Sequence, residues 1–149
     1  VEMYLNSIKL FLKQKNVDLE KTQVVFEITL SNLKTDGEID EQDFLDRAKY
    51  MIKSGGENIY PAEIERVLLA DKRIADAVVI KKPDDKWGEV PVVFIARVDE
   101  SLTDEDVEAL CRENLAGYKR PKEVHFVALN DFPRSITGKI QRHEMEAWL

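Results

Sequence analysis

The sequence predicts a small α+β domain in which a sheet packs against helices, preceded by a short hairpin. Apolar residues recur at helical spacing in some segments and form short alternating or continuous runs in others, and the two kinds of segment alternate along the chain. The 149 residues are 44% hydrophobic and 34% charged. This is enough for one ordinary domain, or for a domain of about 100 residues with an appendage.

The N-terminal residues form a separate part of the pattern. Residues 3–16 carry apolar side chains at every third or fourth position, which predicts an amphipathic helix. Residues 22–30 alternate between apolar and other side chains, which predicts a half-buried strand. Residues 1–44 therefore form an N-terminal extension of one helix and one strand, of unknown origin, and a second domain covers residues 45–149.

Strands and helices alternate through this second domain. Pro61 suits the first position of a helix, and Thr103 followed by Asp106 predicts a capping box at the start of another. A polar turn is expected between the two longest strands, over residues 81–89. The expected elements are strand 50–52, helix 62–70, strands 74–80 and 91–98, helix 103–115, strand 123–127 and helix 141–149.

Charge and composition exclude several classes of function. The net charge of −7 predicts no general affinity for nucleic acid or for acidic membrane surfaces. No apolar run approaches the length of a membrane span and no signal peptide is evident, so a cytoplasmic location is expected. One cysteine, Cys111, and two histidines are too few for a zinc site. The acidic segment 36–43 fits a calcium loop poorly, because Lys34 occupies a ligand position; no metal site is predicted.

The segment from Pro133 to Ile140 carries the most distinctive chemistry. A turn-forming proline, two hydroxyl residues and Gly138 precede Lys139, which places the ammonium group on a tight loop. A compact cation on a long stem suits phosphate or carboxylate chemistry. Taken alone, the pattern also fits a solvated loop lysine.

Four segments, the last of which includes this loop, form one pattern along the chain. In order and spacing, residues 46–149 resemble the C-terminal, swinging domain of the adenylate-forming superfamily. The form Gly-Gly-Glu-Asn-Ile-Tyr-Pro favours AMP-forming acyl-CoA synthetases over amino-acid-activating peptide synthetases. The segments are residues 46–49, residues 53–65, residues 83–89, and residues 118–122 with the closing loop through Lys139.

The resemblance implies a two-step ligase. A carboxylate and ATP give an acyl-adenylate and pyrophosphate, and the thiol of coenzyme A then gives a thioester and AMP. In this family the small domain swings between two poses against a large N-terminal domain. That domain, which holds most contacts to ATP, Mg²⁺ and the acyl group, has no counterpart here. The chain alone is therefore not expected to turn over, and the large domain is its expected partner.

The resemblance also implies a role for particular residues. Lys139 would be the catalytic cation of adenylation, Asp46 and Lys49 would form the hinge, and Arg47 would bind the nucleotide. The loop that faces the active site during thioester formation would consist of Lys53, Ser54, Gly55, Gly56, Glu57 and Asn58.

Several of these positions have a plainer interpretation. Lys49 could instead be a lysine at the start of a strand. Arg47 could instead be an ordinary ion-pair partner. Two adjacent glycines also suit a simple hairpin turn, which is compatible with a channel wall. Trp87 and Tyr118 are expected to be packing residues of the scaffold. Lys119 and Lys122 are expected to be solvated charges, although they could also contact the phosphates of coenzyme A.

A second function belongs to another class. A proline, four residues and then Gly-Lys, as in Pro133 to Lys139, is a form by which certain protein acetyltransferases recognise such synthetases. Acetylation would remove the charge of Lys139. The chain would then be a regulatory or interaction module without turnover.

Overall fold

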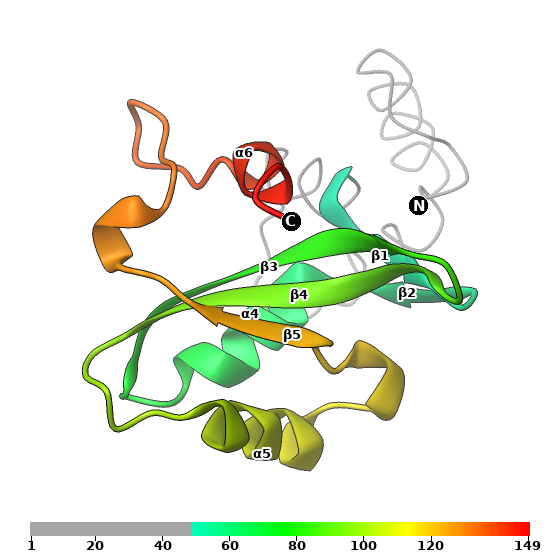
Figure 1. The fold of residues 1–149 in the computed structure, drawn as a ribbon, viewed down its shortest axis with the longest axis horizontal. Helices are drawn as coiled ribbons and strands as arrows, with labels where there is room; N and C mark the ends of the chain where they lie inside the picture. Colours follow the sequence, from blue (N-terminus) through cyan, green and yellow to red (C-terminus); the bar gives the residue numbers. More distant parts are fainter. Residues whose placement is uncertain (1–48) are drawn as a thin grey trace, which may run out of the picture. The chain divides into compact units, whose positions relative to one another are not determined.

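A computed structural model describes residues 49–149 and confirms the α+β class (Figure 1). The chain divides into two units, residues 1–50 and residues 51–149, and the second unit contains all the elements described below. The extension's predicted helix and strand, and the boundary between residues 44 and 45, lie outside the described residues. No helix in the described part is long and apolar enough to cross a membrane.

Five strands form one mixed sheet in the order β2-β1-β4-β3, with β5 also paired to β4. All neighbours are antiparallel except β4 and β5, which are parallel and are joined through the helix α5. The strands are β1 (Ile52–Ser54), β2 (Glu57–Ile59), β3 (Ile74–Asp84), β4 (Gly88–Arg97) and β5 (Glu123–Phe126).

The helices begin where the sequence predicts. Pro61 occupies the first turn of α4, and Thr103 and Asp106 form the expected capping box before α5. The helices are α4 (Pro61–Leu69), α5 (Asp104–Asn114) and α6 (Arg142–Glu146), with short 3₁₀ turns η1 (Gly117–Lys119) and η2 (Leu129–Asp131).

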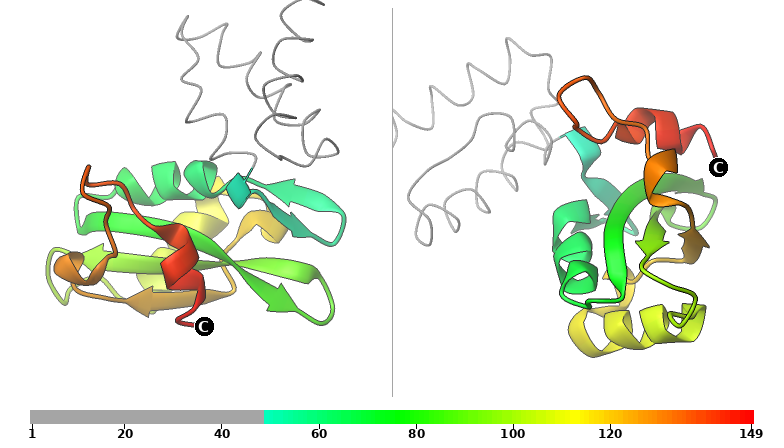
Figure 2. Two further views of the ribbon diagram at one scale, coloured as in Figure 1. Left: turned by 90° about the horizontal axis from the view of Figure 1, so that it is seen from above. Right: turned by 90° about the vertical axis from the view of Figure 1, so that its left-hand side faces the viewer.

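The sheet is buried on both faces. One face packs against α4 and α5, and the C-terminal segment with α6 crosses the other (Figure 2). Strands covered on both sides need apolar residues at successive positions, which explains the continuous runs in β3 and β4. The first core includes Ile52, Ile64, Leu68, Val79, Val93, Ile95 and Val107, and the second Val78, Ile80, Val92, Phe94, Phe132 and Met145.

Three predicted boundaries are wrong. The polar segment 81–89 is mostly strand, because pairing continues to Asp84 opposite Gly88 and the Asp84 carboxylate accepts the N–H groups of Lys86 and Trp87 in the turn. Tyr50 is helical, and β1 begins only at Ile52, where pairing with Ile59 starts. The last helix is α6 alone, five residues long.

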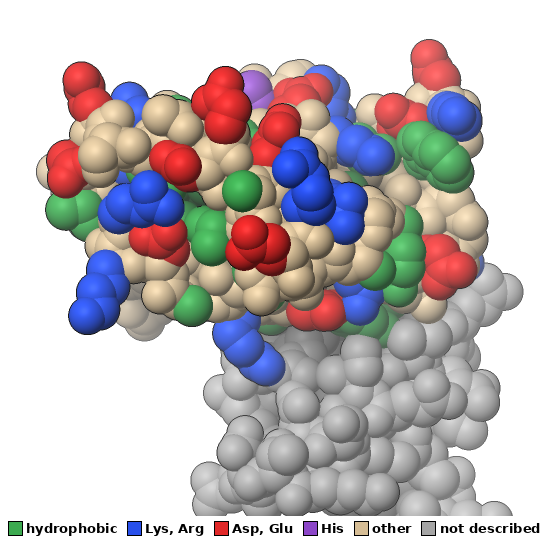
Figure 3. All heavy atoms as spheres, turned by 90° about the horizontal axis from the view of Figure 1, so that it is seen from below, with side chains coloured by type: hydrophobic (Ala, Val, Ile, Leu, Met, Phe, Trp, Pro, Cys, Tyr) green, Lys and Arg blue, Asp and Glu red, His purple; other side chains and the backbone are tan. Residues whose placement is uncertain are grey.

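The outer face seen from below in Figure 3 mixes the two signs of charge. Acidic and basic side chains lie interspersed on it, with single apolar side chains between them. This is the pattern of an ordinary solvated surface.

Candidate functional site

Lys139 lies on a small hairpin, residues 133–141, that we call the lysine hairpin. Arg134 and Ile140 form an antiparallel bridge, the N–H of Ser135 donates to the carbonyl of Lys139 (2.8 Å), and the N–H of Gln141 donates to the carbonyl of Pro133 (2.8 Å). A β-turn closes it, with the N–H of Gly138 donating to the carbonyl of Ser135 (2.9 Å). The predicted tight loop is thus confirmed.

Gly138 closes this turn in a conformation that other residues rarely adopt. Its φ is 86°, in the left-handed region, where a side chain would strain the backbone. Ile136, at the tip, is fully exposed, and Lys139 is exposed just after the glycine. The turn therefore places Lys139 at the surface of the domain.

Ion pairs that the sequence analysis missed hold this hairpin to the domain. Arg142, directly after it, donates to both carboxylate oxygens of Glu65 on α4 (2.5 and 3.0 Å) and to the carbonyl of Val79 (2.9 Å). Glu65 also accepts the N–H of Val79 (3.2 Å). Arg134 pairs with Asp76 on β3 at 2.8 Å.

The Glu65–Arg142 pair therefore crosses the edge of β3 that lies away from β4. Val79 has its backbone N–H and C=O directed away from β4, and the pair satisfies both groups. Because α4 covers one face of the sheet and the C-terminal segment the other, this contact joins the two layers. Glu65 lies inside a segment quoted for the resemblance, but nothing in its spacing pairs it with a residue 77 positions later.

The predicted thioester-forming loop is the turn between β1 and β2. The hairpin interpretation of Gly55 and Gly56 is confirmed, with φ of 56° and 82°. Trp87 packs on Gly55 so closely that a Cβ there would lie 2.8 Å from its ring. The N–H of Gly55 donates to the carbonyl of Trp87 (2.8 Å), and that of Lys53 to Glu89 Oε2 (3.0 Å).

The structure does not bring the two predicted sites together. Figures 1 and 2 show the lysine hairpin and the β1–β2 turn at opposite ends of the sheet. A rigid domain with this layout presents one site or the other to a single partner surface.

The predicted hinge and nucleotide residues are only partly described. Asp46 and Arg47 lie outside the described residues, and their roles stay predictions. Lys49 is exposed and helical, so the alternative in which it begins a strand is wrong. Its ammonium lies 5.3 Å from the centroid of the Tyr50 ring.

Lys119 is expected to be a solvated charge, but in the structure it forms an ion pair. Its ammonium contacts both carboxylate oxygens of Glu63 on α4 (3.0 and 3.1 Å). The hydrogen bonds that the ammonium donates to Glu63 raise the pKa of Lys119 above its usual value. Lys119 therefore joins η1 to α4, whereas Lys122 is exposed as expected.

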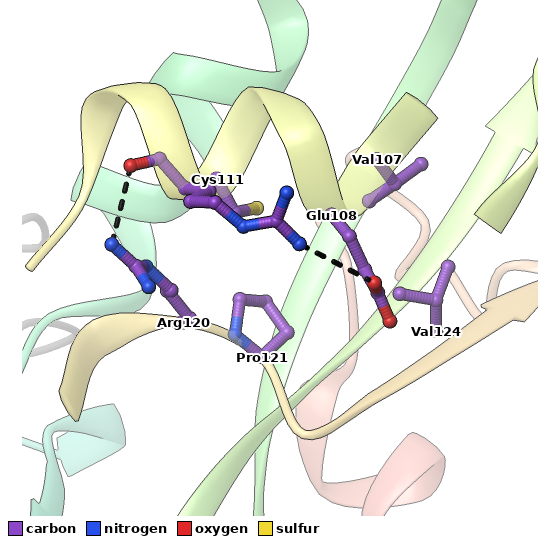
Figure 4. A pocket seen from close by; sticks show the side chains of 7 residues that line it. Val107, Glu108, Cys111, Arg120, Pro121 and Val124 are labelled. Carbon is purple, nitrogen blue, oxygen red and sulfur yellow. Dashed lines mark hydrogen bonds and ion pairs between the residues drawn. The ribbon is translucent and has the colours of Figure 1, made fainter. Parts of the chain in front are cut away.

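A pocket of about 150 Å³ lies between α5 and the start of β5 (Figure 4). Arg120 donates to the carbonyl of Arg112 at the end of α5 (3.2 Å), and Arg112 approaches Glu108 (3.9 Å). Cys111 is the only nucleophile lining it, and burial raises the pKa of its thiol to about 11. A neutral, buried thiol is a poor nucleophile, so Cys111 gives the pocket no reactive group. None of the predicted site residues lines the pocket.

The comparisons with known proteins identify the family of the domain. Residues 63–139, just over half of the chain and ending at Lys139, match the family described as AMP-binding enzyme C-terminal domain. The chain belongs to this family.

Within the described residues, no group of three His, Cys, Asp or Glu side chains could hold a metal ion.

Curated relatives and solved structures point to acyl-CoA synthetases of the adenylate-forming superfamily. The chain is 44% identical over 113 residues to 2-succinylbenzoate–CoA ligase of Listeria monocytogenes and 45% identical over 114 residues to that of Bacillus pumilus. These matches cover 74% of this chain and 24% and 23% of the relatives. The chain thus spans about a quarter of the length of these relatives, and the family that it matches is described as a C-terminal domain.

Solved structures give the same result. A Mycobacterium tuberculosis fatty acyl CoA synthetase matches with a TM-score of 0.62 and 39% identity, over 68% of this chain and 21% of that one. o-Succinylbenzoate CoA synthetase from Bacillus subtilis, in complex with its acyl-adenylate intermediate, matches with a TM-score of 0.63 and 37% identity, over 68% and 20%.

The ion pair between Glu65 and Arg142 at the edge of β3 predicts a large loss of stability for Arg142→Met. The change leaves the Glu65 carboxylate, 12% exposed, without its guanidinium partner, and should cost about 3 kcal/mol in urea unfolding. Arg112→Met, which removes an exposed helix pair, should cost under about 0.5 kcal/mol. The double change Glu65→Gln/Arg142→Met should lose less than the sum of the two single changes; strict additivity would contradict the coupling.

The buried thiol predicts a loss of stability at high pH. Its pKa is about 11 in the folded domain, against an ordinary value of 9.0, so between these values only the unfolded chain ionises. The unfolded state then binds fewer protons, and the free energy of unfolding should fall by about 2 kcal/mol between about pH 8 and about pH 10.5. Cys111→Ala should show a fall smaller by this amount, and equal falls in the two proteins would contradict the prediction.

Proposed function

We propose that this chain is the catalytic-lysine and lid domain of an ATP-dependent, AMP-forming acyl-CoA synthetase, acting together with a large N-terminal domain. The observation that carries the proposal is the lysine hairpin. It presents the exposed Lys139 on a hydrogen-bonded turn at one end of the sheet, in a chain of the AMP-binding enzyme C-terminal domain family.

In the first half-reaction the carboxylate oxygen of the acid bonds to the α-phosphorus of ATP, and the bond to the β-phosphate oxygen breaks to release pyrophosphate. Negative charge grows on the oxygens around the phosphorus in the transition state. Lys139 would enter the site and stabilise that charge more than the charge of the ground state. Mg²⁺ and most contacts to ATP and the acyl group belong to the large domain in this proposal.

In the second half-reaction the thiol of coenzyme A attacks the acyl carbon, loses its proton and expels AMP. We assign the β1–β2 turn, Lys53 to Asn58, to this step, because it lies at the opposite end of the sheet from the lysine hairpin. The domain would rotate about a hinge at Asp46 and Lys49, with Arg47 near the nucleotide. A cytoplasmic location fits such a ligase.

Lys139→Gln tests this assignment in a chimera, in which the chain replaces the matching C-terminal region of the Listeria 2-succinylbenzoate–CoA ligase. Adenylate formation, measured by exchange of pyrophosphate into ATP, should fall about 10²- to 10³-fold, because a transition-state cation is lost. Conversion of preformed acyl-adenylate to thioester should be unchanged. Equal loss in both steps, or no loss, would contradict the role. Lys72→Gln, at another exposed lysine with no proposed role, is the matched control.

A second candidate function is regulation by acetylation of Lys139. The side chain is exposed on a turn, where an enzyme can reach it, and it follows the Pro133 to Gly138 pattern. Acetylation would remove the charge that the first proposal requires. Mass spectrometry after incubation of the chain with a protein acetyltransferase and acetyl-CoA should find acetyl-Lys139. An unmodified Lys139, with other exposed lysines modified instead, would contradict the proposal.

A further inference from the structure

The peptide unit that joins Gly138 to Lys139 is held at both of its polar groups. Its carbonyl oxygen accepts from Arg134 Nη1 (3.0 Å), and its N–H donates to Ser135 Oγ (3.2 Å). Ser135 Oγ also lies 2.9 Å from Thr137 Oγ1. The backbone that carries Lys139 is therefore fixed by side chains as well as by the hairpin's own bonds.

Arg134 links this peptide to the sheet. Its second terminal nitrogen, Nη2, donates to Asp76 Oδ2 (2.8 Å) while Nη1 holds the Gly138 carbonyl. A planar guanidinium can bridge two acceptors in a fixed geometry, which one ammonium cannot reproduce. The side chain is 40% exposed and is ordered by these partners rather than by burial.

Asp76 is in turn fixed on β3. Its Oδ1 accepts the N–H of Ala77 (2.9 Å), so both carboxylate oxygens have a defined partner. The register of β3 shifts between Ile74 and Asp76, where one extra residue forms a bulge. Ile74 faces the core beneath α4 and α5, and after the bulge Val78 faces the core beneath the C-terminal segment. The bulge therefore turns Asp76 toward the lysine hairpin.

We infer that Arg134 and Asp76 are positioning residues that set the placement of Lys139 for adenylation. The path runs from the β3 bulge through the Asp76 carboxylate and the Arg134 guanidinium to the Gly138 carbonyl. The inference rests on the proposed function, because it matters only if Lys139 acts on the α-phosphate. A cation displaced by about 1 Å in the transition state can cost a rate factor of about 100.

An ordinary surface ion pair is the competing explanation, and it makes different predictions. Such a pair would contribute a little to stability and nothing to one half-reaction in particular. Loss of a pair that positions Lys139 should slow adenylation selectively. Restoring the two charges without the contact to the Gly138 carbonyl should not restore the adenylation rate.

The test compares Arg134→Lys, Asp76→Asn and the exchange Asp76→Arg/Arg134→Asp in the chimera described above. Each should slow pyrophosphate exchange about 10- to 100-fold and leave thioester formation from preformed acyl-adenylate within about twofold. The exchanged pair should stay slow, because aspartate cannot donate to the Gly138 carbonyl. Arg112→Lys, which changes an arginine on the opposite face, should leave both rates unchanged.

The outcomes separate the two proposals. If Lys139→Gln leaves adenylation intact, the proposed function fails. If Lys139 is needed but Arg134→Lys and Asp76→Asn have no effect, or slow both half-reactions equally, the inference alone is overturned. The full chain gives a readout without catalysis: the backbone amide NMR signals of Gly138 and Lys139 should shift in Asp76→Asn and not in Arg112→Lys. Unshifted signals in Asp76→Asn would also overturn it.

Discussion

The layered structure depends on how the outer edge of β3 is closed. Within the described residues 49–149 this strand pairs only with β4, so the backbone groups of Val79 face away from the sheet and need other partners. Glu65 from the layer on one face and Arg142 from the layer on the other satisfy both groups and each other. The same contact that protects the edge fixes the C-terminal segment, and with it the lysine hairpin, against the sheet.

Under the proposed function, this arrangement makes the domain a carrier of two sites. The β1–β2 turn is held to β4 and to Trp87, and the lysine hairpin to β3, at opposite ends of the sheet. Neither turn needs to change shape for the other to be used. Alternation between half-reactions would then come from motion of the whole domain, with local geometry conserved in both poses.

Much of this could be predicted from the sequence, and the strand pairing and ion pairs that could not be predicted share a cause. Pro61, Thr103 and the Gly55–Gly56 pair act through local backbone rules, so their elements were predicted correctly. The polar residues 81–84 were assigned to a turn because their strand is stabilised by pairing with β4, which local composition does not reveal. The partners of Arg134 and Arg142 are 58 and 77 residues away, beyond the reach of any spacing rule.

Lys139 belongs to an ordered hairpin of the folded domain rather than to a flexible arm. Amide hydrogen exchange of the native chain can distinguish the two. The N–H groups of Ser135, Gly138 and Lys139 each have an acceptor within the hairpin, and they should exchange far more slowly than an unstructured peptide. The N–H of Ile136, at the exposed tip, should exchange quickly. Exchange of all four at the unstructured rate would contradict the account.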